Sequence, residues 1–459
     1  MDNSSVILVA DGLTPGRLDA AIRAGDVPAL AALADEGVHA VLTTVFPSVT
    51  GVAYIPMLTG VHPAEAGVPG LRWYDRSRRL PAILGHSRSY VGTQIRAIND
   101  DLSPTVATAF EQAGGAALGM EAVVTRGLPA HRQLDRGFTH AARVIHAHVT
   151  GDVDRWLALE EELAETLVRR IRQEKPPFVF AAFTAGDKAA HRGGEHAPGV
   201  MQSLKLVDRV VHSIREDAKR DGRWSTMQLR VVSDHGHSAV HSHLDLAAEL
   251  RAKGARVRSH PWTFPDRSQA AVMVSGNSMA HVYLGLDDRT RQPWSALQNR
   301  WRAETEWLWT HPAVDLLAAQ TSPNIVAVWK HGQRGEISRT ARGFSYRHGD
   351  GDPLGIDSFE DLCDDAVHER TLGTVYPDSV AQLAHLVLAP RSGDLVISAT
   401  PGWDLRRQYE PIDHVSSHGA LHAAHMLVPL VGNRRPQIRP RRTADVFTTA
   451  SRALESGQF

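Results

Sequence analysis

The sequence predicts an α/β protein with a mostly parallel central sheet, helices on both faces of that sheet, and an inserted smaller cap domain. Three observations lead to this fold class. Short apolar runs alternate with helical patterns, which is the order that places parallel strands beside crossover helices. Aspartates follow closely after three of the apolar runs. The composition of the sequence changes between residues 244 and 394, where six of the ten tryptophans lie.

The first elements follow from local residue patterns. Val6–Ala10 is a short apolar run, typical of a buried parallel strand. The loop Phe46-Pro47-Ser48-Val49-Thr50-Gly51 separates the next strand pattern from a helical one. The elements expected in this part are a strand over 6–10, helices over 15–24 and 28–36, a strand over 40–45 and a helix over 52–59.

The middle of the chain repeats the alternation. Apolar residues recur at helical spacing from Trp156 to Ile171, and Pro176-Pro177 ends that pattern. Phe178–Phe183 is again a short apolar run. The elements expected here are a helix over 152–175, a strand over 178–183, a helix around 201–214 and a strand over 229–233.

Three acidic residues come just after the predicted strands, namely Asp11, Asp187 and Asp234. Ligands of open α/β sheets bind outside the carboxyl ends of the strands. Because these ends lie at one edge of a parallel sheet, we expect the three carboxylates to meet.

The chain is expected to divide into three segments. Residues 1–243 form the first part of the catalytic core, 244–394 form the insertion or cap, and 395–459 form the second part of the core. Leu395–Ala399 is expected to resume the central sheet, residues 426–431 to form another strand, and 443–454 to form a closing helix.

Composition limits the function classes. Lys and Arg number 50 against 51 Asp and Glu, a net charge of −1, so nucleic acid is not an expected partner. The one cysteine, Cys363, excludes an internal disulfide and a thiolate metal cluster. Histidine is abundant, with 25 residues. A metal site in this protein would therefore use imidazole and carboxylate.

The sequence predicts a cytoplasmic protein without a membrane span. No apolar stretch reaches the length of about 18 residues that a span needs. The apolar run Val6–Ala10 is too short for the core of a signal peptide, and no basic segment precedes it.

Five short motifs carry candidate chemistry. Each alone has an ordinary structural interpretation, such as a helix cap, a turn or a solvated pair. Together they supply what two divalent ions about 4 Å apart require, which is a set of oxygen and nitrogen ligands with a nucleophile between them. The motifs are Asp11, Thr50, the i, i+4 pair Asp187 and His191, Asp234-His235-Gly236, and His418-Gly419.

These motifs resemble the alkaline phosphatase superfamily, and most closely its nucleotide pyrophosphatase/phosphodiesterase and phosphonoacetate hydrolase branches. They occur in the order of that family and cover both ends of the chain, whereas residues 244–394 match it only loosely. The segments that carry the resemblance are Val9-Ala10-Asp11-Gly12, Phe46-Pro47-Ser48-Val49-Thr50, Leu58-Thr59-Gly60-Val61-His62-Pro63, Asp187-Lys188-Ala189-Ala190-His191, Ser233-Asp234-His235-Gly236 and His418-Gly419.

The resemblance implies roles for particular residues. Thr50 would be the nucleophile and would pass through a phospho-threonine intermediate. The cofactors would be two divalent metal ions, zinc first and manganese as the alternative. One metal would be held by Asp187, His191 and His418, and the other by Asp11, Thr50, Asp234 and His235.

The sequence departs from the phosphodiesterase pattern at the donor to the phosphate oxygens. An asparagine is expected some twenty residues after the nucleophile, and Leu71 or its neighbours stand there instead. Arg72 or Lys188 could replace it, and Tyr54 is a third candidate substrate contact. His237, His241 and His243 crowd the segment after His235, and we interpret them as supporting or surface groups.

The resulting hypothesis is a two-metal hydrolase of phosphate esters, of the phosphodiesterase or nucleotide pyrophosphatase type, whose partner is a small anionic phosphate or phosphonate. The same site could instead cleave a phosphonate C–P bond, hydrolyse a monoester or transfer a phosphoryl group. A catalytically inactive binding protein is the alternative from another class. A sulfatase is excluded because Cys363 lies in the wrong sequence context.

Overall fold

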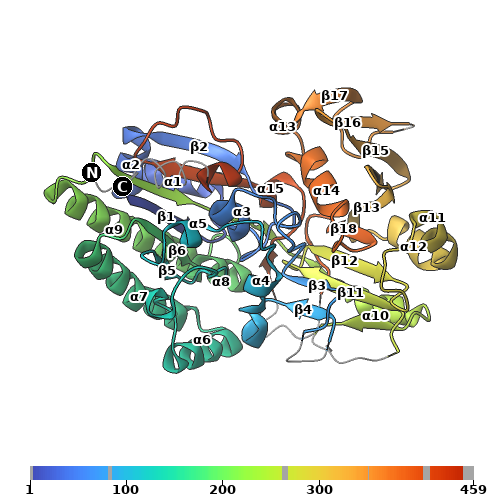
Figure 1. Cartoon of the computed structure of the whole chain (residues 1–459), viewed down its shortest axis with the longest axis horizontal. Helices are drawn as coiled ribbons and strands as arrows, with labels where there is room; N and C mark the ends of the chain where they lie inside the picture. The colour runs from blue at the N-terminus through green and yellow to red at the C-terminus, as the bar shows by residue number, and fades with distance from the viewer. Residues whose placement is uncertain (1–3, 81–84, 261–266, 350, 407–413, 448–459) are drawn as a thin grey trace.

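The computed structural model describes residues 4–80, 85–260, 267–349, 351–406 and 414–447. Two sheets lie side by side and divide the molecule into two halves (Figure 1). The N-terminal half of the chain builds most of the first sheet, and the segment after residue 256 builds the second. The predicted α/β core with a separate second region is therefore confirmed, although the sheet of that second region has more strands than the central one.

The central sheet has six strands within the described residues, in the order β2-β21-β7-β1-β6-β5. Neighbouring strands from β7 to β5 run parallel, and β21 runs antiparallel to both β2 and β7. The strands are β1 (Ser4–Ala10), β2 (Val38–Thr43), β5 (Leu118–Met120), β6 (Phe178–Phe183), β7 (Met227–Val232) and β21 (Leu427–Gly432).

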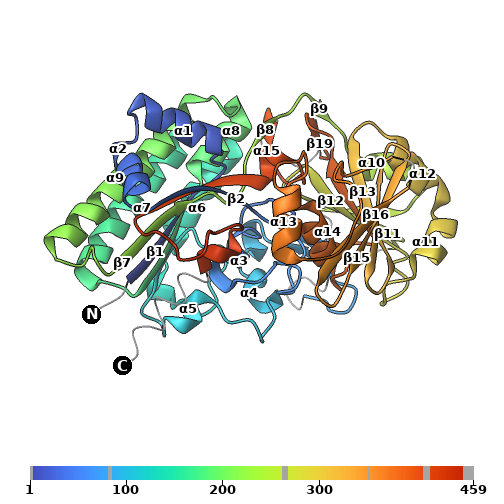
Figure 2. The ribbon, with the colours of Figure 1, turned by 90° about the horizontal axis from the view of Figure 1, so that it is seen from above.

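Helices cover both faces of the central sheet (Figure 2). The alternation of side chains along β1 sends Val6 and Leu8 into one apolar cluster and Ile7 and Val9 into another. The first cluster includes side chains from α1 (Pro15–Ala24), α2 (Pro28–Glu36), α7 (Val153–Glu174) and α9 (Pro198–Arg220). The second includes side chains from α3 (Tyr54–Thr59), α4 (Ala97–Asp101) and α5 (Ala109–Gln112).

The second sheet has nine strands among the described residues, in the order β10-β11-β12-β18-β13-β14-β15-β16-β17. Only β10 and β11 pair in parallel within it. Its strands are β10 (Val257–Ser259), β11 (Ala270–Ser275), β12 (Met279–Leu284), β13 (Val314–Ser322), β14 (Ile325–Lys330), β15 (Gln333–Arg339), β16 (Gly343–His348), β17 (Phe359–Cys363) and β18 (Leu395–Ala399).

The prediction that Leu395–Ala399 resumes the central sheet is wrong. This segment is β18, and it lies between β12 and β13 with antiparallel pairing to both. Its apolar side chains enter the core of the second sheet. A run of five apolar residues fits the buried interior of either sheet, so the pattern alone does not identify the sheet. The chain returns to the central sheet only at β21.

Several short elements connect or flank the two sheets. The remaining helices are α6 (Phe138–Thr150), α8 (Ala185–Gly193), α10 (Leu246–Ala252), α11 (Trp294–Arg300), α12 (Arg302–Thr310), α13 (Asp364–Thr371), α14 (Ser379–Val387) and α15 (Ala423–Met426), with the 3-10 turns η1 (Gly92–Gln94) and η2 (Ala130–Arg132). The remaining strands are β3 (Arg72–Tyr74), β4 (Ser87–Ser89), β8 (Ser238–Ala239), β9 (Ser242–His243), β19 (Trp403–Asp404) and β20 (Ser416–Ser417).

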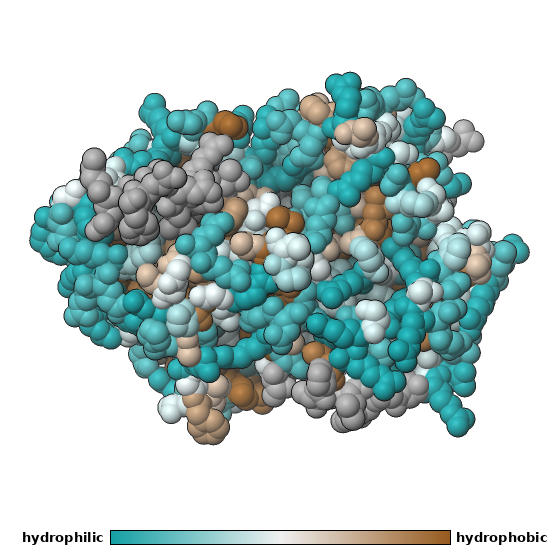
Figure 3. All heavy atoms as spheres, in the orientation of Figure 1, coloured by the Kyte–Doolittle hydropathy of each residue, from teal (hydrophilic) through white to brown (hydrophobic). Residues whose placement is uncertain are grey.

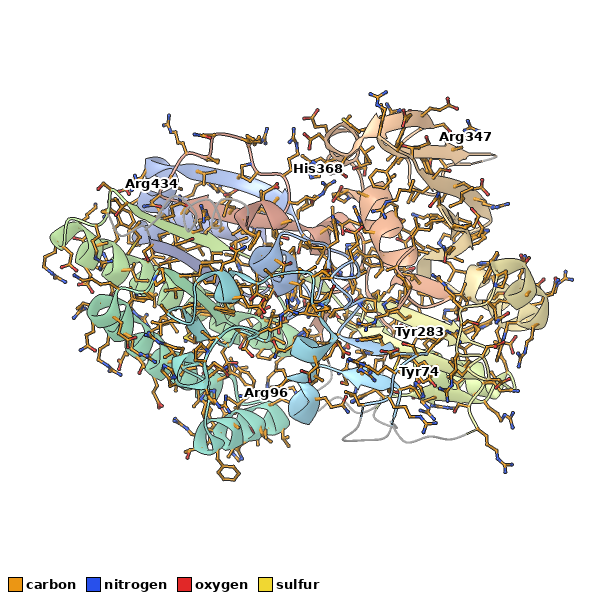
Figure 4. The ribbon with its side chains drawn as sticks, viewed as in Figure 1. Tyr74, Arg96, Tyr283, Arg347, His368 and Arg434 are labelled. Atoms are coloured by element: carbon orange, nitrogen blue, oxygen red, sulfur yellow. The ribbon has the colours of Figure 1, made fainter. Side chains whose placement is uncertain are left out.

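The β3–β4 hairpin joins the first half of the chain to the second sheet. The rings of Tyr74 and Tyr283 lie 5.9 Å apart between centroids, and both appear at this junction in Figure 4. The backbone N–H of Arg72 donates to Ser275 Oγ at 3.2 Å at the end of β11. The hairpin therefore places Arg72 beside the edge where the two sheets meet.

Two predicted helices differ from the structure. The helix expected over 52–59 begins at Tyr54, and residues 50–53 form a turn that leads into it. The helix expected over 443–454 lies mostly outside the described residues, although 444–447 are helical.

Candidate metal and phosphate site

The three aspartates predicted at strand ends meet at one edge of the central sheet. Asp11 follows β1, Asp234 follows β7 by two residues, and Asp187 lies in the first turn of α8, shortly after β6. All three side chains are buried. The backbone N–H of Gly12 donates to Asp234 Oδ1 at 3.3 Å, which ties the ends of β1 and β7 together. The expected convergence therefore occurs.

Thr50 lies directly against one part of this cluster. Its Oγ1 atom is 3.3 and 3.4 Å from the two carboxylate oxygens of Asp11 and 3.0 Å from His235 Nε2. His235 Nε2 is in turn 3.3 Å from Asp11 Oδ1 and 3.4 Å from Asp234 Oδ2. The four residues expected around one metal are thus brought together.

The residues expected around the other metal face Asp187. Its Oδ1 atom is 3.2 Å from His191 Nε2 and 3.6 Å from His418 Nε2. The i, i+4 spacing on α8 places Asp187 and His191 on one face of the helix. His418 reaches the site from the segment after β20, and its ring stacks on that of His235 at 3.6 Å between centroids.

Backbone carbonyls fix the tautomers of these histidines. His191 Nδ1 donates to Ser416 O at 2.8 Å, His418 Nδ1 to Ser48 O at 2.9 Å, and His235 Nδ1 to Gly236 O at 3.1 Å. A carbonyl can only accept, so each Nδ1 carries the proton. In the neutral ring the Nε2 lone pair then points at the carboxylates, which is the orientation that metal-binding histidines adopt.

The electrostatics of the cluster also fit cations. Burial and the neighbouring Asp234 raise the pKa of Asp11 well above its usual value, and burial with Asp187 raises the pKa of Asp234 to about 7. Burial lowers the pKa of His235 to about 3, so its imidazole is neutral. Among the described residues Asp234 Oδ2 has no hydrogen-bond partner. A buried carboxylate oxygen without a partner is costly, and a bound cation would satisfy it.

A cavity of about 610 Å³ opens beside Thr50. Its lining includes the cations Lys188 and Arg406 and the imidazole of His260, whose pKa burial lowers to about 3. The lining also has apolar residues, namely Leu71, Val91, Ile95, Val123, Ile145 and Trp156. Figure 3 shows apolar side chains over α6, where Phe138, Ile145 and Val149 are exposed.

The sequence family is decided by a match over nearly the whole chain. A sequence model of the type I phosphodiesterase / nucleotide pyrophosphatase family matches residues 5–421, a range that contains every candidate residue from Asp11 to His418. The chain belongs to this family.

Members and structural neighbours of the phosphodiesterase family resemble the chain at low identity. Human ectonucleotide pyrophosphatase/phosphodiesterase family member 7 is 25% identical over 221 residues, which is 47% of this chain and 44% of the relative. Phosphonoacetate hydrolase from Sinorhizobium meliloti 1021, solved with phosphonoacetate, is 19% identical with a TM-score of 0.57 over 99% of this chain and 96% of its own. Murine ectonucleotide pyrophosphatase/phosphodiesterase 5, solved as an inactive threonine-to-alanine variant with AMP, is 14% identical with a TM-score of 0.57 over 99% and 95%. These structures share the fold.

The three candidate substrate contacts have different surroundings in this family member. Arg72 lines the cavity, and its guanidinium donates to Val274 O at 3.2 Å. Lys188 also lines the cavity, and its Nζ atom lies 2.6 Å from Asp187 Oδ2. Tyr54 is fully buried, and its hydroxyl donates to Asp11 Oδ2 at 3.2 Å. Tyr54 therefore contacts the Asp11 carboxylate, and it is not among the residues that line the cavity.

Other residues at the phosphodiesterase-family site were not assigned to it from the sequence. His414 lines the cavity, and its ring stacks on that of His191 at 4.1 Å between centroids. Asn277, in the turn between β11 and β12, donates through Nδ2 to His414 Nδ1 at 2.8 Å and to Asp404 Oδ2 at 3.0 Å. No motif links these residues, because they meet only when the second sheet packs against the central one. His237, interpreted above as a supporting or surface group, is buried beside Asp187.

Glu160 of α7 supports the start of α8 from below. Its Oε1 atom accepts hydrogen bonds from the backbone N–H of Thr184 and Ala185, the second at 2.7 Å. The side chain is buried, and within the described residues Oε2 has no hydrogen-bond partner. Burial raises the pKa of Glu160 from its usual 4.5 to about 8.

Glu160→Gln is expected to change how stability depends on pH. Because the pKa of the folded state is raised, the wild-type carboxyl stabilises the fold below about pH 4.5 and loses that contribution as pH rises toward about 8. Glutamine keeps the acceptor oxygen and does not titrate. In urea unfolding of the metal-loaded proteins, the free energy of unfolding of the variant should therefore rise relative to that of wild type by about 3 kcal/mol between pH 5 and 8.5. The exposed Glu165→Gln on the same helix is the matched control, and an equal pH profile in all three proteins would contradict the expectation.

No helix within the described residues is long and apolar enough to cross a membrane.

Proposed function

We propose that this chain is a two-metal phosphodiesterase in which Thr50 attacks phosphorus. The observation that carries the proposal is the position of Thr50 Oγ1, which faces Asp11 and His235 at 3.0 to 3.4 Å and lies at the wall of the cavity. Threonine is a weak nucleophile unless a base or a metal activates its hydroxyl. Family membership supports the reaction class.

The candidate residues divide into two sets of metal ligands. Asp187, His191 and His418 would hold one divalent ion, and Asp11, Thr50, Asp234 and His235 the other; mixed imidazole and carboxylate ligands favour zinc, with manganese as the alternative. Bound ions of this kind supply Lewis acidity that activates oxygen nucleophiles and stabilises leaving oxygens. The Thr50 hydroxyl has one proton, and both the Asp11 carboxylate and the unprotonated Nε2 of His235 lie within hydrogen-bond distance to accept it.

The proposed reaction has two balanced steps. Thr50 Oγ1 forms a bond to phosphorus while the bond from phosphorus to one ester oxygen breaks, and the alcohol leaves with a proton. Water then attacks the phosphorylated threonine, which restores the Thr50 hydroxyl and releases a phosphate monoester. Lys188 and Arg72 line the same cavity and would stabilise the phosphate oxygens, as a point charge and as a planar fork of donors.

The size and lining of the cavity favour a diester over a small monoester. A volume of about 610 Å³ lies within the range of sites for drug-sized ligands and exceeds what a phosphate group alone fills. The apolar residues of its lining would contact the organic substituents of such a diester. AMP, which is bound in the complex of murine ectonucleotide pyrophosphatase/phosphodiesterase 5, is a phosphate monoester of the kind that hydrolysis of a nucleotide diester would release.

Phosphonate cleavage is the second candidate, and a specific observation favours it. The arginines in the cavity lining, Arg72 and Arg406, would suit the carboxylate of a small phosphonate. The phosphonoacetate complex of the Sinorhizobium meliloti hydrolase supports this alternative.

A substrate panel separates the candidates. We expect the zinc-loaded protein to hydrolyse bis(p-nitrophenyl) phosphate with a larger kcat/KM than p-nitrophenyl phosphate, and to release little phosphate from phosphonoacetate. Faster release from phosphonoacetate than from the diester would favour the phosphonate hydrolase. Tight metal binding without turnover of any of the three would favour a binding protein.

The role of the apolar lining residues in substrate binding can be tested by a matched pair of substitutions on α6. Ile145 lines the cavity and is 60% exposed, whereas Val149, one turn later and 62% exposed, lies outside the lining. Ile145→Asp is expected to lower kcat/KM for bis(p-nitrophenyl) phosphate by about tenfold, because the new carboxylate faces both an apolar ring and an anionic phosphate. Val149→Asp should stay within about twofold of wild type. Equal effects of the two substitutions would mean that α6 does not border the substrate.

A further inference from the structure

Three imidazoles, not two, face the carboxylate of Asp187. His237 Nε2 lies 2.7 Å from Asp187 Oδ1, closer than His191 Nε2 at 3.2 Å and His418 Nε2 at 3.6 Å. Single ligand atoms of Asp187, His237 and His418, together with one of His235 from the neighbouring metal position, all lie within 4.8 Å of one another; His191 is not in this set. His237 therefore lies at least as close to Asp187 as the two histidines already assigned to this part of the site.

The protonation of His237 follows from its other neighbour. Its Nδ1 atom lies 3.0 Å from Ser416 Oγ, and that hydroxyl donates its only proton to Ser238 O at 3.0 Å. Ser416 Oγ must then accept from His237, so Nδ1 carries a proton. In the neutral ring the Nε2 lone pair of His237 points at Asp187, as those of His191 and His418 do.

A plain hydrogen bond to Asp187 explains this arrangement less well. Such a bond would need a doubly protonated, charged His237, and its side chain is completely buried. Asp187 already has a cation, because Lys188 Nζ lies 2.6 Å from its other carboxylate oxygen. Three lone pairs directed at one carboxylate oxygen repel one another and the oxygen unless a cation lies among them.

Packing holds the His237 ring in this place. Gly12 has a φ of +72°, and a Cβ atom built on it would lie 2.8 Å from Cδ2 of His237. The ring thus fills space that the glycine after β1 leaves open. It also meets the rings of His191 and His418 edge to face, with centroids 4.9 and 5.2 Å apart. A side chain fixed on both sides in this way is preorganised for ligation.

We propose that His237 is a fourth protein ligand of the metal ion held by Asp187, His191 and His418. The site would then combine one carboxylate with three imidazoles, a set suited to a tightly held zinc-class ion. This inference rests on the metal assignment under the proposed function and adds a ligand to it. His237 would thus differ in role from the nearby His241, whose side chain is exposed.

Metal affinity and cobalt spectroscopy test the inference without relying on turnover. His237→Ala and His237→Gln would be compared with wild type and with His241→Ala as the matched control. Zinc dissociation constants come from competition with a chromophoric chelator, and the visible absorption of the Co²⁺-substituted proteins reports the ligand set. We expect one of the two zinc equivalents to bind at least about 100-fold more weakly in both His237 variants, since altering even an outer partner costs 10- to 100-fold. The cobalt spectrum should change in both variants and stay unchanged in His241→Ala.

Glutamine separates ligation from hydrogen bonding, because its amide can still donate to Asp187. Full zinc affinity in His237→Gln together with loss in His237→Ala would overturn the proposal and leave His237 as a hydrogen-bond donor. Unchanged affinity and spectra in both variants would overturn it as well. A wild-type protein that binds fewer than two metal ions would instead contradict the proposed function, and this ligand assignment with it. Circular dichroism checks that each variant is folded.

Discussion

Thr50→Ala is expected to lower kcat/KM for bis(p-nitrophenyl) phosphate by about 10³-fold or more, while both metal ions stay bound. Removing a nucleophile eliminates the covalent route, and the remaining activity comes from electrostatic stabilisation and binding alone. Asp11, Asp234 and His235, the other proposed ligands of the metal ion assigned to Thr50, remain intact, so the metal content should not fall. Initial rates with metal-loaded protein and elemental analysis of the same samples check the two parts.

Thr50→Ser is the matched control for this substitution. Serine keeps the hydroxyl within reach of Asp11 and His235, and we expect its kcat/KM to stay within about tenfold of wild type. Activity of the alanine variant close to that of wild type would show that water, and not Thr50, attacks phosphorus. Loss of activity accompanied by loss of metal would show that Thr50 acts mainly as a ligand.

Removal of the metal ions is expected to abolish turnover and to destabilise the fold. Asp11, Asp187 and Asp234 are buried together. Among the described residues, Lys188 is the one lysine or arginine whose contacts with this group are seen. Without divalent ions their mutual repulsion and desolvation are uncompensated. After dialysis against a chelator, activity should fall to background and Tm by about 5 °C or more, and zinc or manganese should restore both.

A second cluster of the chain serves as the control for metal content. His348, Asp352 and Asp357 also lie within ligand distance of one another. However, the Asp352 carboxylate already accepts from the backbone N–H groups of Leu354, Ile356 and Asp357 and from the Tyr346 hydroxyl. Asp357→Ala should therefore leave two metals per chain, whereas Asp234→Ala should leave fewer. Equal stoichiometry in the two variants would place the metals elsewhere.

Local patterns were sufficient to predict much of the core. The apolar run before Asp11 is β1, the proline-led helical patterns are α1 and α2 with the expected bounds, and Phe178–Phe183 is β6. The convergence of Asp11, Asp187 and Asp234 followed from a general rule about the carboxyl ends of parallel strands. The sequence-based assignment thus depended on hydrophobic periodicity and on the order of elements along the chain, and both can be read from one sequence.

Features that depend on packing between distant segments were not predictable in this way. Leu395–Ala399 has the same pattern as a core strand, and only its neighbours place it in the second sheet. Tyr54 lies four residues after Thr50, the proposed nucleophile, but its side chain is buried and its hydroxyl donates to Asp11. His237 is one of several histidines in a row, and its position beside Asp187 depends on the turn after β7 and on Gly12.

The most direct test of the account is to trap the covalent intermediate. Zinc-loaded protein would be mixed with bis(p-nitrophenyl) phosphate, quenched with acid within the first turnovers, and its peptides analysed by mass spectrometry. The account predicts a phosphoryl ester adduct on the peptide that contains Thr50, present in wild type and in Thr50→Ser and missing from Thr50→Ala. An active enzyme whose adduct lies on another residue, or one that accumulates no adduct while the released nitrophenol shows a burst, would contradict it.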